Sequence, residues 1–168
     1  ASVVARGEVG KGLKFPVGEM VIAEKSSAKG DVNINRACDG LPAKVGYNRW
    51  HGLGMHAPGY ATFGLGKGAM FFHAGCSILD KGVGGSVVFN VIGDGRLLHS
   101  TGVVRHGDPI REIKVDIRDV KELRLEVTDA GDGNEGDRTY WIDAVFEYKP
   151  GCYPPGNVFN HSRQVGIL

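Results

Sequence analysis

The chain has 168 residues, which is enough for one domain with a sizeable hydrophobic core. Its 20 basic residues nearly balance its 19 acidic residues, so the strong basic excess that is typical of nucleic-acid-binding proteins is missing. No apolar run approaches the roughly 20 residues of a membrane span. Composition and charge therefore predict a domain that binds neither nucleic acid nor membrane.

Glycine and cysteine narrow the class of protein further. The 27 glycines are about twice the usual share of roughly 7%, and many lie between short apolar runs, as expected for strands joined by tight turns. The three cysteines are Cys38, Cys76 and Cys152. They have no C-x-x-C spacing, which argues against a zinc ribbon or a dithiol redox site. One disulfide with a free thiol, or three buried thiols, both fit the count.

The first third of the chain carries weak structural signals. Residues 20–23 form a short apolar run that predicts a strand, and the polar residues 24–46 predict a loop. Residues 47–65 mix aromatic side chains, histidines and glycines, with a turn at Pro58-Gly59.

Strand signals sharpen from residue 69. Residues 69–78 predict a largely buried strand with a bulge at Gly75. Residues 86–92 predict the next strand, and the Gly-Asp-Gly sequence at 93–95 predicts a hairpin turn. Residues 96–100 are then the returning strand of the hairpin.

Three later segments alternate apolar and polar side chains, which predicts strands with one buried face. These segments are residues 113–118, 123–128 and 141–148. In the last one, strict alternation assigns Ile142 and Ala144 to one face and Trp141 to the other. About eight strands without an amphipathic helix predict an all-β fold, an antiparallel β-sandwich or jelly roll. We expect one domain over residues 1–148, and a linker or surface strap over the proline-rich residues 149–168.

Two motifs resemble known sites, but their sequence context argues against those sites. Residues 64–69 fit a loose dinucleotide-binding fingerprint, but a strand-like segment follows where a helix is needed. His51 and His56 are five residues apart around glycines, which suits neither a helical nor a strand pair of metal ligands. His56 is therefore expected to make structural hydrogen bonds or to line a ligand pocket.

Four carboxylates fall within nine residues, at Asp129, Asp132, Glu135 and Asp137. Close carboxylates repel one another unless a cation or hydrogen bonds offset the charge. Calcium binds six to eight oxygens, including carbonyls that glycine-rich loops present. A calcium site and a solvated acidic turn are both consistent with this spacing. A glycosidase pair of acids is less consistent, since such pairs usually come from separate elements across a cleft.

Several aromatic side chains are candidate platforms for a sugar, because the C–H face of a pyranose ring stacks on an aromatic ring. They are Trp50, Tyr60, Tyr140, Trp141 and Tyr153. Core packing is the competing interpretation for any one of them. Residues 105–108 read Arg-His-Gly-Asp and offer planar groups for sugar hydroxyls between two strands.

Five segments in register resemble the NPCBM family, also classed as family 51 carbohydrate-binding modules. The segments are HGLGMHAP at 51–58, FHAGCSILD at 72–80, GSVVFNVIGDG at 85–95, LRLEVTDAGDG at 123–133 and DRTYWIDA at 137–144. The resemblance covers roughly residues 45–148. Departures from the family pattern lie at polar positions, among them His51, Met55, Leu79, Arg138 and Tyr140.

The resemblance implies a galactose-binding-domain-like jelly roll that is not catalytic. Such modules attach a parent secreted glycoside hydrolase to glycans with terminal galactose-type sugars, and they hold a structural metal ion, usually calcium. The implied partners are therefore these glycans and a catalytic domain, and the implied location is extracellular, although no signal peptide is visible in this chain.

The resemblance also directs the choice of site residues. The residues expected near the sugar are His56, Tyr60, Arg105, His106 and Trp141. The residues expected to bind calcium, together with backbone carbonyls, are Asp129, Asp132 and Asp143.

Two other functions are also consistent with the sequence. An adhesion or protein-interaction module on the same fold predicts an exposed apolar patch in place of a polar pocket. A small β-sandwich hydrolase or lyase predicts two acids facing each other across a groove.

Overall fold

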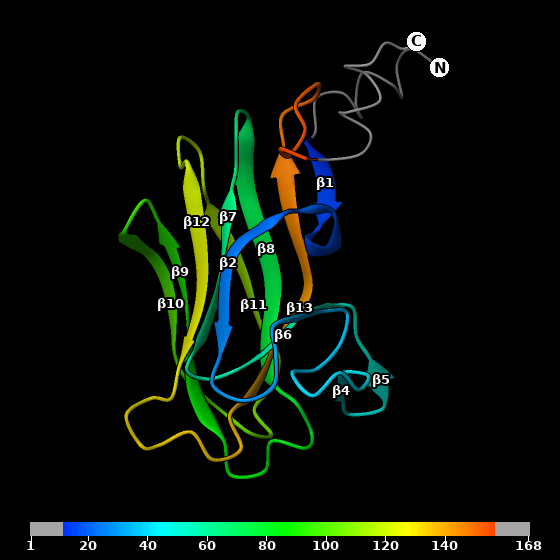
Figure 1. Ribbon diagram of the computed structural model, residues 1–168, viewed down its shortest axis with the longest axis vertical. Helices are drawn as coiled ribbons and strands as arrows, with labels where there is room; N and C mark the ends of the chain where they lie inside the picture. Colours follow the sequence, from blue (N-terminus) through cyan, green and yellow to red (C-terminus); the bar gives the residue numbers. More distant parts are fainter. Residues whose placement is uncertain (1–11, 157–168) are drawn as a thin grey trace.

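The computed structural model describes residues 12–156 as two antiparallel β-sheets packed face to face (Figure 1). One sheet has the order β11-β8-β13-β6-β3, with β1 also paired to β13, and the other has the order β10-β9-β12-β7-β2. The bounds in the first sheet are β1 Leu13–Pro16, β3 Asn33–Ile34, β6 Gly52–His56, β8 Ala69–Ile78, β11 Arg111–Asp116 and β13 Arg138–Tyr148. Those in the second are β2 Ile22–Ser27, β7 Gly59–Gly64, β9 Ser86–Gly93, β10 Arg96–Arg105 and β12 Glu122–Thr128.

Two short elements lie outside this pair of sheets. The strands β4 (Lys44–Val45) and β5 (Asn48–Arg49) form a small hairpin on one side of the sandwich (Figure 1). The 3-10 helix η1 (Val17–Glu19) follows β1. In the described part of the chain, no helix is long and apolar enough to cross a membrane.

The predicted all-β sandwich is confirmed, and several predicted elements match closely. The strand at 69–78 is β8, and the Asp94-Gly95 turn joins β9 to β10. The prediction of a loop over residues 24–46 is wrong, because β2 runs to Ser27 and β3 and β4 follow. The burial of all three strands is low, and β3 and β4 are only two residues long, so they carry little of the hydrophobic alternation that identifies a strand.

An aromatic cluster joins the two sheets at the centre of the core. The Trp141 ring lies 5.0 Å from that of Phe89 on the opposite sheet and 6.0 Å from that of Phe72 on its own sheet, both centroid distances at edge-on angles. The Phe146 ring lies 5.1 Å from Phe72 and 5.2 Å from Phe63, which again crosses between the sheets. All five side chains are fully buried, so this cluster accounts for much of the apolar surface that folding removes from water.

A bulge in β13 explains why Trp141 faces the core. Ile142 pairs with Gly75 and Val145 pairs with His73, so β13 uses one residue more than β8 over this stretch. Asp143 takes a left-handed backbone at the extra position, with φ of 48°. The bulge therefore lies on β13, and the prediction of a bulge at Gly75 is wrong. An inserted residue reverses the alternation, which places Trp141 on the same face as Phe146.

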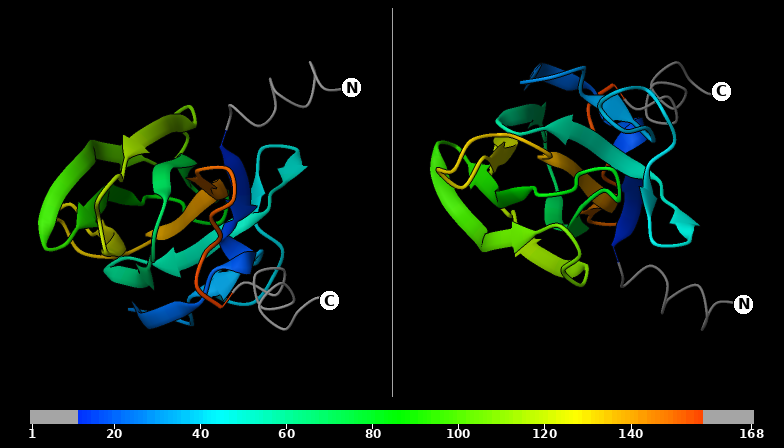
Figure 2. Two further views of the ribbon diagram at one scale, coloured as in Figure 1. Left: turned by 90° about the horizontal axis from the view of Figure 1, so that it is seen from above. Right: turned by 90° about the horizontal axis from the view of Figure 1, so that it is seen from below.

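The antiparallel pairing sorts the connections to two ends of the sandwich (Figures 1 and 2). We call one end the loop end, which holds the segments 28–32, 57–58, 79–85, 106–110 and 129–137. The opposite end holds the segments 17–21, 65–68, 94–95, 117–121 and 149–156. Loops at one end of a rigid sandwich are a common place for a binding site.

The described part of the C-terminal segment packs against the opposite end. Lys149 donates its backbone N–H to the Gly68 carbonyl at 2.8 Å, and the Tyr153 ring contacts Phe15 at 5.9 Å. Residues 157–168 of the predicted linker or strap lie outside the described residues. Cys38, Cys76 and Cys152 are all free thiols, and burial raises the pKa of Cys76 far above its usual range.

Trp141→Ala tests the role of the aromatic cluster. We expect the free energy of unfolding to fall by about 3–5 kcal/mol, because the change leaves a large cavity between the sheets. Urea unfolding followed by fluorescence and circular dichroism measures the loss. Leu97→Ala, at an exposed position, is the control and should change stability by about 0.5 kcal/mol or less. An unchanged stability for Trp141→Ala would contradict a core role.

Candidate functional site

The structure brings some of the predicted sugar-contacting residues to the loop end and leaves others elsewhere. His56 ends β6 there, but its side chain is buried, with 2% of its surface exposed. Its Nδ1 lies 2.8 Å from the carbonyl oxygen of Ala57, and its backbone N–H donates to Ser27 Oγ. Burial lowers the His56 pKa, and the charges of Lys29 and Arg138 lower it further. His56 therefore supports the loops from beneath and offers no free ring to a ligand.

Arg105 and His106 lie at the same end, where β10 finishes. The Arg105 backbone N–H donates to the Asp108 carboxylate at 2.8 Å, which closes the turn. The His106 ring Nε2 lies 3.0 Å from the Asp80 carbonyl, and its backbone N–H donates to the Gly85 carbonyl. These contacts place His106 beside the segment 79–85, at the edge of a nearby pocket.

That pocket, which we call the Arg138 pocket, lies where β8 ends and β13 begins and has a volume of about 200 Å³. Its lining consists of Ala37, Asp39, Leu41, Pro42, Lys44, Leu79, Asp80, Lys81 and Arg138. Arg138 Nη1 donates to Asp39 Oδ2 at 2.8 Å, and the two side chains are about one-third exposed. The Arg138–Asp39 pair is thereby held at the mouth rather than buried.

The chemistry of the Arg138 pocket suits a small neutral polyol. Carboxylates accept hydrogen bonds and cationic side chains donate them, so the lining offers both partners that a sugar hydroxyl needs. Leu41, Leu79 and Pro42 add an apolar wall for C–H groups. The volume lies below the roughly 300–1,000 Å³ of pockets for drug-sized ligands, so it fits one sugar ring rather than a chain.

Tyr60 and Trp141 do not join this pocket. Tyr60 lies on the outer face of the second sheet, where the Arg124 guanidinium covers its ring at 3.7 Å. Trp141 is fully buried in the aromatic cluster. The prediction that Trp141 contacts the sugar is therefore wrong, because a ring with no exposed surface cannot stack on a ligand.

The acidic segment 129–137 folds around Ser86. The Asp137 Oδ1 accepts the Ser86 backbone N–H at 2.9 Å, while the Ser86 hydroxyl donates to the Asp132 carboxylate. Asp137 is 1% exposed, and its Oδ2 is buried without a hydrogen-bond partner. Burial, together with the nearby charges of Asp132 and Asp129, raises the pKa of Asp137 to about 6. A buried carboxylate oxygen without a partner is costly, and a cation would offset that cost.

The predicted calcium ligands fit this arrangement only in part. Asp132 and Asp129 lie near Asp137, but Asp143 does not. Asp143 is exposed in the β13 bulge, where its backbone N–H donates to the His51 carbonyl, roughly 20 Å along the strand from Asp137. Among residues 12–156, no three His, Cys, Asp or Glu side chains come together as a ready set of metal ligands. Asp132 and Asp137 are the side chains that suit a hard cation, and backbone carbonyls would have to complete the shell.

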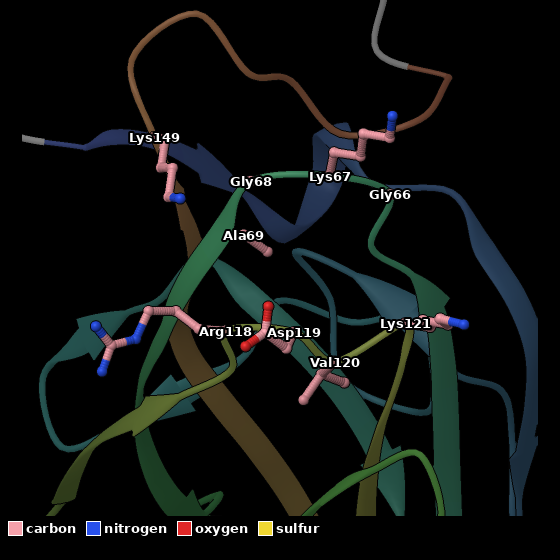
Figure 3. Close-up of a pocket in the computed structure, with 9 residues that line it drawn as sticks. All are labelled: Gly66, Lys67, Gly68, Ala69, Arg118, Asp119, Val120, Lys121 and Lys149. Atoms are coloured by element: carbon pink, nitrogen blue, oxygen red, sulfur yellow. The ribbon is translucent and has the colours of Figure 1, made fainter.

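A larger cavity of about 560 Å³ lies at the opposite end (Figure 3). Its lining consists of Gly66, Lys67, Gly68, Ala69, Arg118, Asp119, Val120, Lys121 and Lys149. Figure 3 shows the Lys67, Arg118 and Lys121 side chains pointing away from its centre, toward which the Asp119 carboxylate points. No aromatic ring lines it, and Arg118 is engaged by Asp116. Its charged lining is mostly cationic, with Asp119 as the one carboxylate, so it offers fewer acceptors for sugar hydroxyls than the Arg138 pocket does.

Fold and site together define a class of protein, the small β-sandwich modules that bind carbohydrate and carry no catalytic centre. The acids of the segment 129–137 gather around Ser86 rather than facing a second acid across a groove, as a glycosidase would require. The chain belongs to the NPCBM/NEW2 domain family, whose model matches residues 15–147.

Known relatives agree with this assignment. A Renibacterium salmoninarum protein that carries the name endo-alpha-N-acetylgalactosaminidase is 31% identical over 125 residues, which cover 73% of this chain and 8% of that protein. A solved structure of CBM51-2 in complex with GlcNAc and INT domains, from Clostridium perfringens ZmpB, is 26% identical with a TM-score of 0.73, and the match covers 81% of this chain and 32% of that one.

A third relative matches along its whole length. The CBM51 module from Clostridium perfringens GH95, solved in complex with methyl-galactose, has a TM-score of 0.72 at 22% identity, over 80% of this chain and 99% of that one. This likeness shows the same fold in a separate module. The present chain spans less than a tenth of the enzyme relative and about a third of the ZmpB structure.

Sequence reasoning missed Asp39, Arg138 and Asp137 as site residues. Asp39 lies in the weakly patterned first third, 99 positions from Arg138, and nothing in the sequence joins the two. Arg138 had a usable signal, because it departs from the family pattern next to a matched segment. Asp137 was recognised within the acidic cluster, but only the structure shows that it is the buried member.

The buried His56 predicts a pH effect on stability. Its pKa is lowered in the fold, so as pH falls through about 6.5 the unfolded chain takes up a proton that the folded chain resists. The His56 contribution to stability should therefore fall between pH 7.5 and pH 5, while the raised pKa of Asp137 acts in the opposite direction. We expect His56→Gln to remove the His56 contribution, so that the change from pH 7.5 to pH 5 is less destabilising in the variant than in the native chain, measured by urea unfolding at both pH values. His51→Gln, at an exposed position, is the control, and an equal pH dependence of stability in His56→Gln and the native chain would contradict this role.

Proposed function

We propose that this module attaches a larger extracellular glycoside hydrolase to glycans that end in a galactose-type sugar. The Arg138 pocket carries the proposal, because it combines paired donors and acceptors with an apolar wall in a volume suited to one ring. The relatives support the association with an enzyme, since one carries a glycosidase name and another is a module of a GH95 protein.

The orientation of the domain supports an anchoring role. The Arg138 pocket lies at the loop end, while the first and last described strands, β1 and β13, have Leu13 and Tyr148 paired at the opposite end. A module that is tethered at one end can present the other end to a glycan without obstruction. The exposed large apolar side chains of the described chain are spread over β1, β10 and several connections, which favours a polar binding site over the single apolar patch that an adhesion surface would need.

A structural cation completes the proposal. Asp137 and Asp132 would bind a calcium ion together with backbone carbonyls of the loop end. The ion would offset the charge of the buried Asp137 carboxylate and fix the segment 129–137 against β9. It would stabilise the loops rather than contact the sugar.

Arg138→Gln tests the sugar site. The variant loses the guanidinium charge and the ion pair with Asp39, so we expect at least tenfold weaker binding to methyl-galactoside in calorimetry. Arg118→Gln is the matched control, because it breaks an arginine–aspartate pair at the opposite end and should bind normally. N-acetylgalactosamine, N-acetylglucosamine and glucose establish selectivity. If the native chain binds no galactose-type sugar, or if Arg138→Gln binds equally well, the proposal is wrong.

The cation is tested through thermal stability. Saturating calcium should raise the melting temperature of EDTA-treated protein by about 5 °C or more, because an ion that binds only the folded state stabilises it. Asp137→Asn should lose this response, since the amide is a weaker ligand for calcium. Asp143→Asn is the matched control and should keep the response, because Asp143 lies away from the cluster. An equal melting temperature with EDTA and with calcium would contradict the proposed calcium site.

A further inference from the structure

A second pocket adjoins the Arg138 pocket, and Pro42 lines both. We call it the Trp50 pocket; it has a volume of about 310 Å³ and is lined by Asn35, Arg36, Pro42, Ala43, Arg49, Trp50 and His51. The residues come from the segment before β4, from β5 and from the residues that follow β5. The shared wall makes the two pockets neighbours along the same side of the molecule.

Hydrogen bonds fix Trp50 in this pocket, and its side chain is only half-buried. Its backbone N–H donates to the Ala43 carbonyl at 3.0 Å, its indole N–H points to the Val45 carbonyl at 3.4 Å, and Tyr140 donates its hydroxyl to the Trp50 carbonyl at 3.0 Å. The side chain packs against a second, smaller apolar cluster and is half-buried. A ring fixed in this way loses little conformational freedom when a sugar stacks on it.

The charge of the Trp50 pocket differs from that of the Arg138 pocket. Arg36 and Arg49 are exposed, and neither forms an ion pair with an acid in residues 12–156. No Asp or Glu lines the pocket; Asp143 donates its backbone N–H to the His51 carbonyl but is not part of the lining. The pocket thus offers two guanidinium groups as donors and lacks a carboxylate as acceptor.

This donor excess selects the chemistry of the ligand. A neutral sugar hydroxyl needs an acceptor for its proton, whereas a carboxylate or sulfate group only accepts hydrogen bonds. A guanidinium group matches such a planar or tetrahedral anion with two parallel N–H groups. The ring of the same sugar would lie on Trp50 while its acidic group meets Arg36 and Arg49.

We infer that the Trp50 pocket is a second subsite that binds an acidic sugar, one with a carboxylate or a sulfate ester, next to the galactose-type sugar. The inference rests on the proposed function for its placement, because the neighbouring sugar would occupy the Arg138 pocket. The preferred ligand is then an acidic oligosaccharide rather than a neutral monosaccharide.

Calorimetry with the full chain tests the subsite, using lactose, sialyl-lactose and sulfated lactose as probes. We expect at least one acidic probe to bind about tenfold or more tightly than lactose at low salt, and the preference to shrink as salt is raised. The carboxylate and sulfate probes identify which acidic group is favoured. Equal affinity for neutral and acidic probes, or no binding of either acidic probe, would overturn the inference.

Variants separate this subsite from the Arg138 pocket. Arg36→Gln with Arg49→Gln should abolish the preference for the acidic probe while lactose binding stays within about twofold. Arg96→Gln with Arg118→Gln removes the same charge at the opposite end and should keep the preference. Trp50→Ala should weaken the acidic probe further, and its melting temperature checks folding. A preference that survives the Arg36 and Arg49 changes would contradict the assignment.

The two proposals fail in different ways. Loss of lactose binding in Arg138→Gln, with no acidic preference in the native chain, supports the galactose site and rejects the second subsite. Acidic probes that bind through Arg36 and Arg49 while lactose fails to bind would support the subsite and reject the galactose site.

Discussion

The contact between Trp141 and Phe89 is the interaction on which this fold depends most. It joins the two sheets at their centre, and the rings of Phe72, Phe146 and Phe63 extend it to either side. Because the sheets meet through rigid rings, the strand ends have fixed positions. The loops that carry Asp39 and Asp80, and the start of β13 at Arg138, therefore have a defined framework.

The position of Trp141 also marks the limit of what periodicity can predict. The alternation in residues 113–118 and 123–128 gave the correct faces, because those strands pair without interruption at these positions. In β13 the same rule put Trp141 on the wrong face, since the extra residue at Asp143 reverses the pattern halfway along. A bulge of this kind has no reliable sequence signal when the residue with positive φ is an aspartate instead of glycine.

The site was harder to predict than the fold for a related reason. The strands of the sandwich follow from local patterns, but the Arg138 pocket joins residues from the segment before β4, from the end of β8 and from the start of β13. The segment before β4 looked like a featureless loop, yet it forms the wall between two pockets. The acidic segment 129–137 was correctly recognised as unusual, whereas the choice among its carboxylates depended on burial, which only the fold reveals.

The bulge in β13 also ties the core to the surface. Asp143 donates its backbone N–H to the carbonyl of His51, and Tyr140, two residues before the bulge begins at Ile142, donates its hydroxyl to the carbonyl of Trp50. Strand β13 thus packs Trp141 into the core on one face of its sheet. On the opposite face, Tyr140 of the same strand holds the backbone of Trp50 at the surface. A change of register in β13 would move both tryptophans at once, so selection for a stable core and for a fixed binding surface acts on one strand.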